Sequence, residues 1–335
     1  SLICFFLIKI LKKMPTSKIT WISILQGWAM LLVVLGHCSV WTANDWRFHF
    51  CYGVHMPLFM FVSGGLFYYT RISRGWRWGD VVVDKLKRLG VPYLFFIAFA
   101  FGLKVALSGL VKNPVDASLS GFLAGFVFPI QSGMKEMWFV AALLLLMFCY
   151  PLYGLLLRSR VAVAMALALG VVFTFVFPGY TGGGVFNWQG ALRYFVFFFG
   201  GMAFFKYNLL RFVKNASVGV ILFALYSAIC VFRREQPFLV ASVGILACVN
   251  LCVLAAERLP RLFASFRDYS FQIFLLGIYP QMFVDLILIR RFTEPWQQAA
   301  LLVLSVGLGI YFSVGVAKAA KRIGNKYVDM ALGLK

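Results

Sequence analysis

Apolar residues fill most of the chain in unbroken stretches of about 20 positions, separated by short polar or charged segments. A stretch of that length wound as an α-helix crosses a bilayer, whereas outer-membrane strands alternate apolar and polar residues over about 10 positions. The pattern therefore predicts an all-α, polytopic membrane protein with about ten transmembrane helices. The predicted spans are Trp21–Val40, Tyr52–Tyr69, Leu89–Val111, Met137–Leu157, Val161–Pro178, Trp188–Phe205, Ala216–Phe232, Phe238–Ala256, Tyr269–Ile289 and Trp296–Ala317.

The spans divide the chain into three parts: a cytoplasmic or interfacial segment (residues 1–20), a ten-helix membrane domain (21–317) and a basic cytoplasmic tail (318–335). Met14 precedes a plausible natural opening, so residues 1–13 are interpreted either as sequence upstream of the native start or as an interfacial helix. The apolar stretch Leu119–Ile130 is too short to cross a bilayer, and we expect a re-entrant or interfacial piece there.

Composition and charge sharpen this assignment. The 335 residues are 62% hydrophobic and 13% charged, outside the usual range of soluble domains, and the net charge is +21. An even number of spans places both termini on one side. If that side is the cytoplasm, the inner segments hold 23 of the Lys and Arg residues and the outer segments hold 7. The charge thus predicts orientation and contact with membrane lipid. It argues against nucleic acid, because it is spread over six segments.

The three histidines gather near the predicted outer surface. His37 lies near the end of the first span, His55 lies near the start of the second, and His49 lies between them. Gln26 precedes His37 by eleven residues, which puts both on one helix face about 16 Å apart. Such a face can line a pocket, because polar groups within a bilayer usually serve a function. The alternative is that these side chains pack in the core, each satisfied by a neighbour.

Two further groups of charged residues are candidates for binding. Glu136, Arg193, Asp285 and Lys104 lie at a depth similar to that of the histidines, and an outer polar cavity, with Arg193 and Asp285 as a possible ion pair, would explain them together. On the inner side the densest cationic patch holds Arg71, Arg74, Arg77, Lys85, Lys87 and Arg88. This patch either contacts anionic lipid or binds the phosphates of a cytoplasmic cofactor.

The cysteines predict no metal site. Cys248 and Cys252 share one helix face without a second pair, so packing is the favoured interpretation. Cys38 and Cys51 both lie on the predicted outer side, where an oxidising compartment would allow a disulfide.

Several segments resemble membrane acyltransferase family 3, the polysaccharide O-acetyltransferase type. The first span, WISILQGWAMLLVVLGHCS, resembles the family's first span, in which a histidine follows a basic residue after a ten-residue gap, and His37 matches that histidine. The second span resembles the family's HMPLFFFISG run, matched from His55 to Gly64.

Weaker similarities extend along the whole chain. KRLGVPY, with Lys87 and Arg88, resembles the basic-to-proline start of the third span, and Trp138 lies in a segment similar to the start of the fourth. The stretch from Tyr269 to Leu276 resembles a late family segment that ends in histidine. This chain departs from the family at three positions: Gln26 replaces the basic residue, Ser23 replaces a nearby acidic or amide residue, and Gly277 replaces the late histidine.

The resemblance implies an acyltransferase of the bacterial cytoplasmic (inner) membrane. It would move an acyl group, with acetyl expected, from cytoplasmic acyl-CoA to a hydroxyl of an envelope polysaccharide, sugar or glycolipid, without a metal. His37 would act as general base or transient acyl carrier, and His55 would orient it or bind the acceptor. The expected acyl-CoA contacts are Gln26, Arg71, Arg74, Lys87 and Arg88. The expected acceptor contacts are Glu136, Trp138, Arg193, Asp285 and Tyr279.

Two other functions stay open at this point. A glycan or lipid transporter, or flippase, would show inverted repeats and helices broken in both halves, and the sequence indicates neither. A family member without catalytic activity could instead serve as an assembly partner, and it would bind acyl-CoA without turnover.

Overall fold

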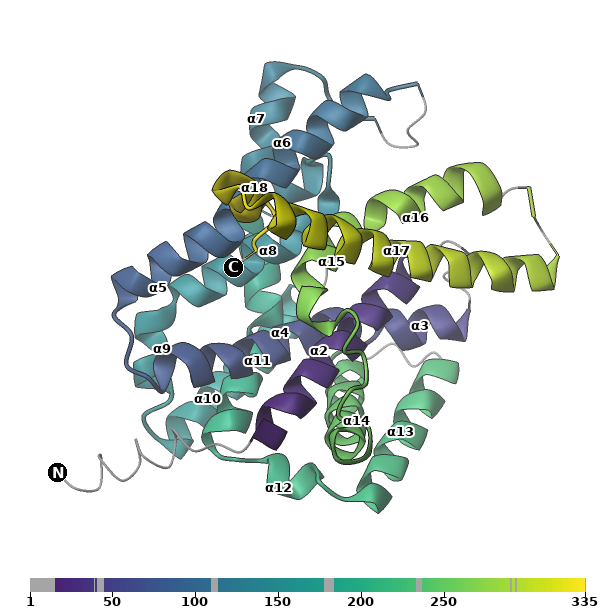
Figure 1. Cartoon of the computed structure of the whole chain (residues 1–335). Coiled ribbons are helices and arrows are strands. Elements are labelled where there is room, and N and C mark those ends of the chain that lie inside the picture. The colour runs from purple at the N-terminus through teal and green to yellow at the C-terminus, as the bar shows by residue number, and fades with distance from the viewer. Residues whose placement is uncertain are drawn as a thin grey trace.

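The computed structural model describes residues 16–38, 40, 45–109, 114–177, 184–232, 237–289, 291–292 and 294–334 (Figure 1). Residues 1–13, whose origin the sequence leaves open, lie outside the described residues. Every regular element within the described ranges is a helix or a helical turn, which confirms the all-α class.

The helices follow the chain in this order: α2 (Thr16–Gly36), α3 (Trp46–Tyr52), α4 (His55–Phe67), α5 (Trp78–Lys85), α6 (Val91–Ala106), α7 (Leu119–Val127), α8 (Trp138–Phe148), α9 (Tyr150–Leu156), α10 (Arg160–Val176), α11 (Trp188–Lys206), α12 (Leu210–Val213), α13 (Ala216–Val231), α14 (Pro237–Arg258), α15 (Ser270–Leu276), α16 (Ile278–Val284), α17 (Pro295–Ile323) and α18 (Lys326–Ala331). Wider π turns continue some helices: η1 (Tyr68–Ile72), η2 (Leu86–Gly90) and η7 (Asp285–Ile289). Tighter 3₁₀ turns are η3 (Pro129–Gln131), η4 (Lys135–Met137), η5 (Val185–Asn187) and η6 (Arg267–Tyr269).

The described parts of all ten predicted spans fall mostly on helices, and two of the spans are bent at a break. The fourth span bends by 59° between α8 and α9, and the ninth bends by 58° between α15 and α16. Pro151, at the start of α9, cannot donate a backbone hydrogen bond and therefore ends the preceding helix. Gly277 occupies the second break. The expectation of unbroken helices was wrong at these two places.

Membrane crossing can be judged by length and hydropathy. In the described part of the chain, four helical stretches are long and apolar enough to cross a membrane: Trp46–Ile72, Trp78–Ala106, Phe238–Arg258 and Pro295–Ile323. The number rises to six if each bent pair forms one span. Three further apolar helices are shorter: Thr20–Gly36, Arg160–Val176 and Ala216–Val231. These helices indicate a multi-pass membrane protein, while the count of ten and the side of the termini stay predictions.

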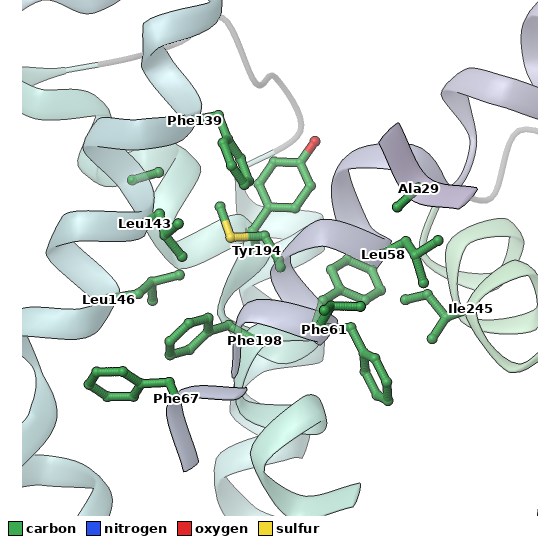
Figure 2. Packing of buried hydrophobic residues seen from close by; sticks show 14 of the residues in the cluster. Ala29, Leu58, Phe61, Phe67, Phe139, Leu143, Leu146, Tyr194, Phe198 and Ile245 are labelled. Atoms are coloured by element: carbon green, nitrogen blue, oxygen red, sulfur yellow. The ribbon is translucent and has the colours of Figure 1, made fainter. Parts of the chain in front are cut away.

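The core is built around α4, which contacts both α2 and α11. A Cβ atom added to Gly64 would overlap the carbonyl oxygen of Phe198, and one added to Gly201 would overlap that of Phe61, so the backbones of α4 and α11 touch. Small residues permit this close approach in membrane helices. Figure 2 shows the aromatic side chains beside the contact, including Phe67 and Phe198, whose ring centroids are 5.9 Å apart.

This contact predicts a strong effect of a single methyl group. Gly64→Ala should separate α4 from α11 and lower the melting temperature, because overpacking a tight core costs about 1–3 kcal/mol or more. Gly102→Ala is the matched control, since no atom lies within 4 Å of the methyl position on α6. Thermal unfolding of both variants in detergent measures the difference. Equal melting temperatures would show that the two helices are not in backbone contact.

Candidate active site

His37 lies immediately after α2, where it meets the beginning of α4. Its ring approaches Tyr52 edge-on, with centroids 6.1 Å apart, and Tyr52 approaches His55 in the same way at 4.8 Å. Gly36 makes room for Tyr52, since a Cβ atom there would lie 3.0 Å from Cε2 of the tyrosine ring. The sequence predicts Tyr52 as the first residue of the second span; in the structure it is the last residue of the short helix α3, and its ring contacts both histidines.

The two histidines differ in their hydrogen bonding. His55 is buried, and its Nδ1 lies 3.0 Å from the carbonyl oxygen of Cys51. A carbonyl can only accept, so Nδ1 donates the hydrogen and Nε2 carries the lone pair of the neutral ring. His37 is half-buried, and neither of its ring nitrogens is hydrogen-bonded to another described residue. Within the described residues His55 is thus held by a backbone carbonyl, whereas His37 makes a ring contact with Tyr52.

Two carboxylates act on His37 from other parts of the fold. Glu136, in the turn before α8, and Asp285, the first residue of π turn η7, both lie within electrostatic range of its imidazole. Glu136 also interacts with Tyr279 on α16 and with Lys104 on α6. We call His37, Tyr52, His55, Glu136 and Asp285 the histidine cluster. It unites residues from four distant segments of the sequence.

Trp138 and Arg193 lie on the α8 and α11 side of this cluster. Trp138 follows Glu136 by two residues, and its indole packs against the ring of Tyr194 in a tilted arrangement with centroids 5.4 Å apart. Arg193 donates to the carbonyl of Phe177 at 2.7 Å, at the end of α10, and it forms no salt bridge with Asp285 among the described residues. A role for these two side chains in binding the acceptor stays a prediction.

One carboxylate, Asp84, interacts with several residues of the predicted cationic patch, and the sequence analysis did not include it among the candidates. Asp84 accepts a hydrogen bond from Arg71 Nη2 at 2.8 Å and forms ion pairs with Arg88 Nε at 3.1 Å and with Lys85 Nζ at 3.4 Å. The guanidinium of Arg71 also lies over the ring of Trp76, 3.9 Å from its centroid. We call Asp84, Arg71, Lys85 and Arg88 the Asp84 cluster. Its signal in the sequence was the four-residue spacing of Asp84 and Arg88, which puts them on one helix face.

The other residues predicted to contact acyl-CoA make fewer interactions within the protein. Arg74 and Lys87 are exposed, so their charges are open to a ligand. Gln26 is half-buried in α2, and its side chain makes no hydrogen bond to another described residue. Lys87 and Arg88 share π turn η2, and Arg71 lies in η1. Such turns are rare and occur frequently at functional sites.

The two clusters lie at opposite ends of α4 and its continuation. His55 opens the helix, and Arg71 follows sixteen residues later in η1, about 24 Å along the axis. A ligand that contacts both clusters must therefore be long and must reach through the helical bundle.

The cysteines offer neither a disulfide nor a metal site within the described residues. Cys38 and Cys51 are both free and buried. No group of three or more His, Cys, Asp or Glu side chains in the described part of the chain is arranged to hold a metal ion.

The all-helical fold, its membrane-crossing helices and the buried polar cluster define a multi-pass membrane protein with an internal site. A family model described as an acyltransferase domain matches residues 19–314, nearly the whole chain. The chain therefore belongs to acyltransferase family 3, whose members are membrane acyltransferases. No curated protein and no solved structure matches it.

The Asp84 cluster predicts a stability effect that is separate from activity. Asp84→Asn should destabilise the protein by about 3 kcal/mol, because it leaves the largely buried Arg71 without its charge partner. Glu257→Gln is the control, since its ion pair with Lys214 is exposed and should contribute less than about 1 kcal/mol. Denaturant unfolding compares the two variants. A smaller loss for Asp84→Asn than for Glu257→Gln would contradict the proposed role of the carboxylate.

Proposed function

We propose that this acyltransferase moves an acetyl group from cytoplasmic acetyl-CoA to a hydroxyl of an envelope polysaccharide, sugar or glycolipid, in the bacterial inner membrane. The family supports acyl transfer as the reaction. The observation that carries the mechanism is the His37 imidazole, which has unbonded ring nitrogens in the described structure and two carboxylates close by. An acceptor hydroxyl is a weak nucleophile near neutral pH, so the reaction needs a base at that position.

The reaction proceeds by proton transfer and addition. The imidazole of His37 takes the proton of the acceptor hydroxyl while the oxygen attacks the thioester carbonyl carbon. The tetrahedral intermediate then expels the thiolate of CoA, which receives that proton from the imidazolium. The products are an ester and free CoA. Glu136 and Asp285 stabilise the imidazolium while it exists, because both carry negative charge in a region of low dielectric constant.

The donor lies along the bundle, with its phosphates at the cytoplasmic end. Arg74 and Lys87 present exposed charges there, and Arg71 and Arg88 contribute from the Asp84 cluster. The long pantetheine arm of CoA suits the separation between the Asp84 cluster and the histidine cluster. Gln26 lies along this path on α2 and would hydrogen-bond the arm in place of the family's basic residue.

The acceptor sugar lies on the outer side of His37. Tyr279 and Trp138 offer a hydroxyl and an aromatic face, and both flank Glu136. His55 presents Nε2 as an acceptor for a sugar hydroxyl, and Arg193 and Asp285 complete the polar surface of the pocket.

The catalytic role of His37 is tested by substitution. His37→Ala should lower the acyl-transfer rate by about 100-fold or more, the contribution expected of a general base. His49→Ala is the matched control, because this histidine lies on α3 and packs its ring against Phe48. Purified protein with labelled acetyl-CoA and an envelope glycan extract provides the measurement. An unchanged rate in His37→Ala would remove this residue from the mechanism.

The donor site is tested separately. Lys87→Ala should raise the KM for acetyl-CoA about fivefold with little change in kcat, since an exposed charge pair contributes about 1 kcal/mol. Arg160→Ala removes a charge that is also exposed, at the start of α10, and should leave KM unchanged. The same rise in both variants would point to the overall field of the membrane surface rather than to a phosphate site.

Transport of a glycan or lipid is a second candidate, favoured by the two broken spans. Broken helices often surround the substrate site of transporters, and here they carry Glu136, Tyr279 and Asp285. Passage of a labelled glycolipid across proteoliposomes without acetyl-CoA would favour transport. Binding of acetyl-CoA with neither passage nor turnover would favour an assembly partner.

A further inference from the structure

At the end of any helix the last four carbonyl groups have no partner within the regular helical hydrogen-bonding pattern, so in α2 they must find partners elsewhere. The carbonyls of Val33 and Leu35 accept backbone hydrogen bonds from His37 and Cys38, both at 3.1 Å. The carbonyl of Val34 accepts from outside the helix: Gln281 of α16 donates to it through Nε2 at 2.8 Å. A side chain from another helix therefore caps the turn that carries His37.

The Gln281 amide contacts three residues, two at the end of α2 and one on α17. Besides Val34, its Nε2 lies 3.3 Å from Sγ of Cys38 and 3.5 Å from Oγ of Ser305 on α17. The Cys38 thiol lies 3.5 Å from the same hydroxyl and 3.3 Å from the Val34 carbonyl. All three polar side chains are buried, with exposed fractions of 3% for Gln281, 2% for Cys38 and 0% for Ser305.

Glycines allow the amide to reach α2. A Cβ atom added to Gly309 of α17 would lie 3.3 Å from Cγ and Cδ of Gln281 and 3.2 Å from Cγ1 of Val34. A Cβ atom added to Gly277 would lie 3.0 Å from the carbonyl oxygen of Gly309. Helices α16 and α17 run side by side (Figure 1), and this close packing places Gln281 within reach of α2.

We infer that Gln281 is a positioning residue for His37. It holds the residues on both sides of the histidine, Val34 three positions before and Cys38 one position after, so it fixes the direction in which the imidazole leaves the helix. Ser305 holds the amide from the other side. The inference rests on the proposed function, because it assigns Gln281 to the placement of the proposed base.

In this role Gln281 orients the His37 side chain and does not itself bind acetyl-CoA. The Nε2 group of Gln281 is hydrogen-bonded within the protein, and none of its partners is a residue proposed for the donor phosphates. Its loss should therefore lower kcat and leave the KM for acetyl-CoA unchanged. Gln272 offers a matched control on the same bent pair: it is also buried, and its Nε2 donates to the backbone carbonyl of Leu332 at 2.8 Å, far along the chain from His37.

The experiment compares Gln281→Met with Gln272→Met, since methionine keeps the length of the side chain and removes the hydrogen-bonding groups. We expect kcat to fall about 10- to 100-fold for Gln281→Met, because a misplaced catalytic group costs that much. The melting temperatures of both variants should fall by similar amounts, and the kcat of Gln272→Met should change less than twofold. A similar kcat in the two variants, or a change confined to KM, would overturn the inference.

A second measurement does not depend on activity. Loss of the cap should let the end of α2 fray, so maleimide should modify Cys38 faster in Gln281→Met than in Gln272→Met, with exposed Cys149 as the internal reference for the reagent. Equal modification of Cys38 in both variants would show that Gln281 caps nothing. If wild-type protein transfers no acyl group, the proposed function fails, and the modification rates still decide whether Gln281 holds the end of α2.

Discussion

The backbone contact between α4 and α11 is the constraint on which both clusters depend. Gly64 and Gly201 bring the two helices together without side chains between them, and this contact holds α4 in place along its length. One end of α4 begins with His55, and the other end continues into the π turn that carries Arg71. The separation of the histidine cluster from the Asp84 cluster is therefore set by one rigid element.

The histidine cluster itself is assembled from helix ends and breaks rather than from helix centres. His37 follows the end of α2, His55 opens α4, and Glu136 lies in a turn before α8. A helix end leaves backbone groups and side chains free to turn toward a common point, whereas the middle of a membrane helix must satisfy its own backbone. The proposed proton transfer would therefore take place where helices begin and end rather than along one of them.

The sequence predicted the helices well, because the length of an apolar stretch alone indicates a membrane-crossing helix. The described parts of all ten apolar stretches fall mostly on helices, and His55, Glu136 and Asp285 lie within electrostatic range of His37, while the depth of these four residues in the membrane stays a prediction. The break at Gly277 and the hydrogen bonds of Asp84 and Gln281 depend on which helices become neighbours. Hydropathy contains no information on that choice, so the sequence could not predict that Arg193 would bind the Phe177 carbonyl rather than approach Asp285.

The three π turns carry Arg71, Lys87 with Arg88, and Asp285. A π turn accommodates one residue more than an α-helical turn. Of the three, η2 runs directly into a further helix, α6, whereas η1 and η7 do not. Because η2 absorbs its extra residue within the turn, removing that residue would leave the side chains of α6 on their present faces and would change only the direction of the charged groups within the turn. The direction of Lys87 and Arg88 is thus encoded in the number of residues as well as in their identity.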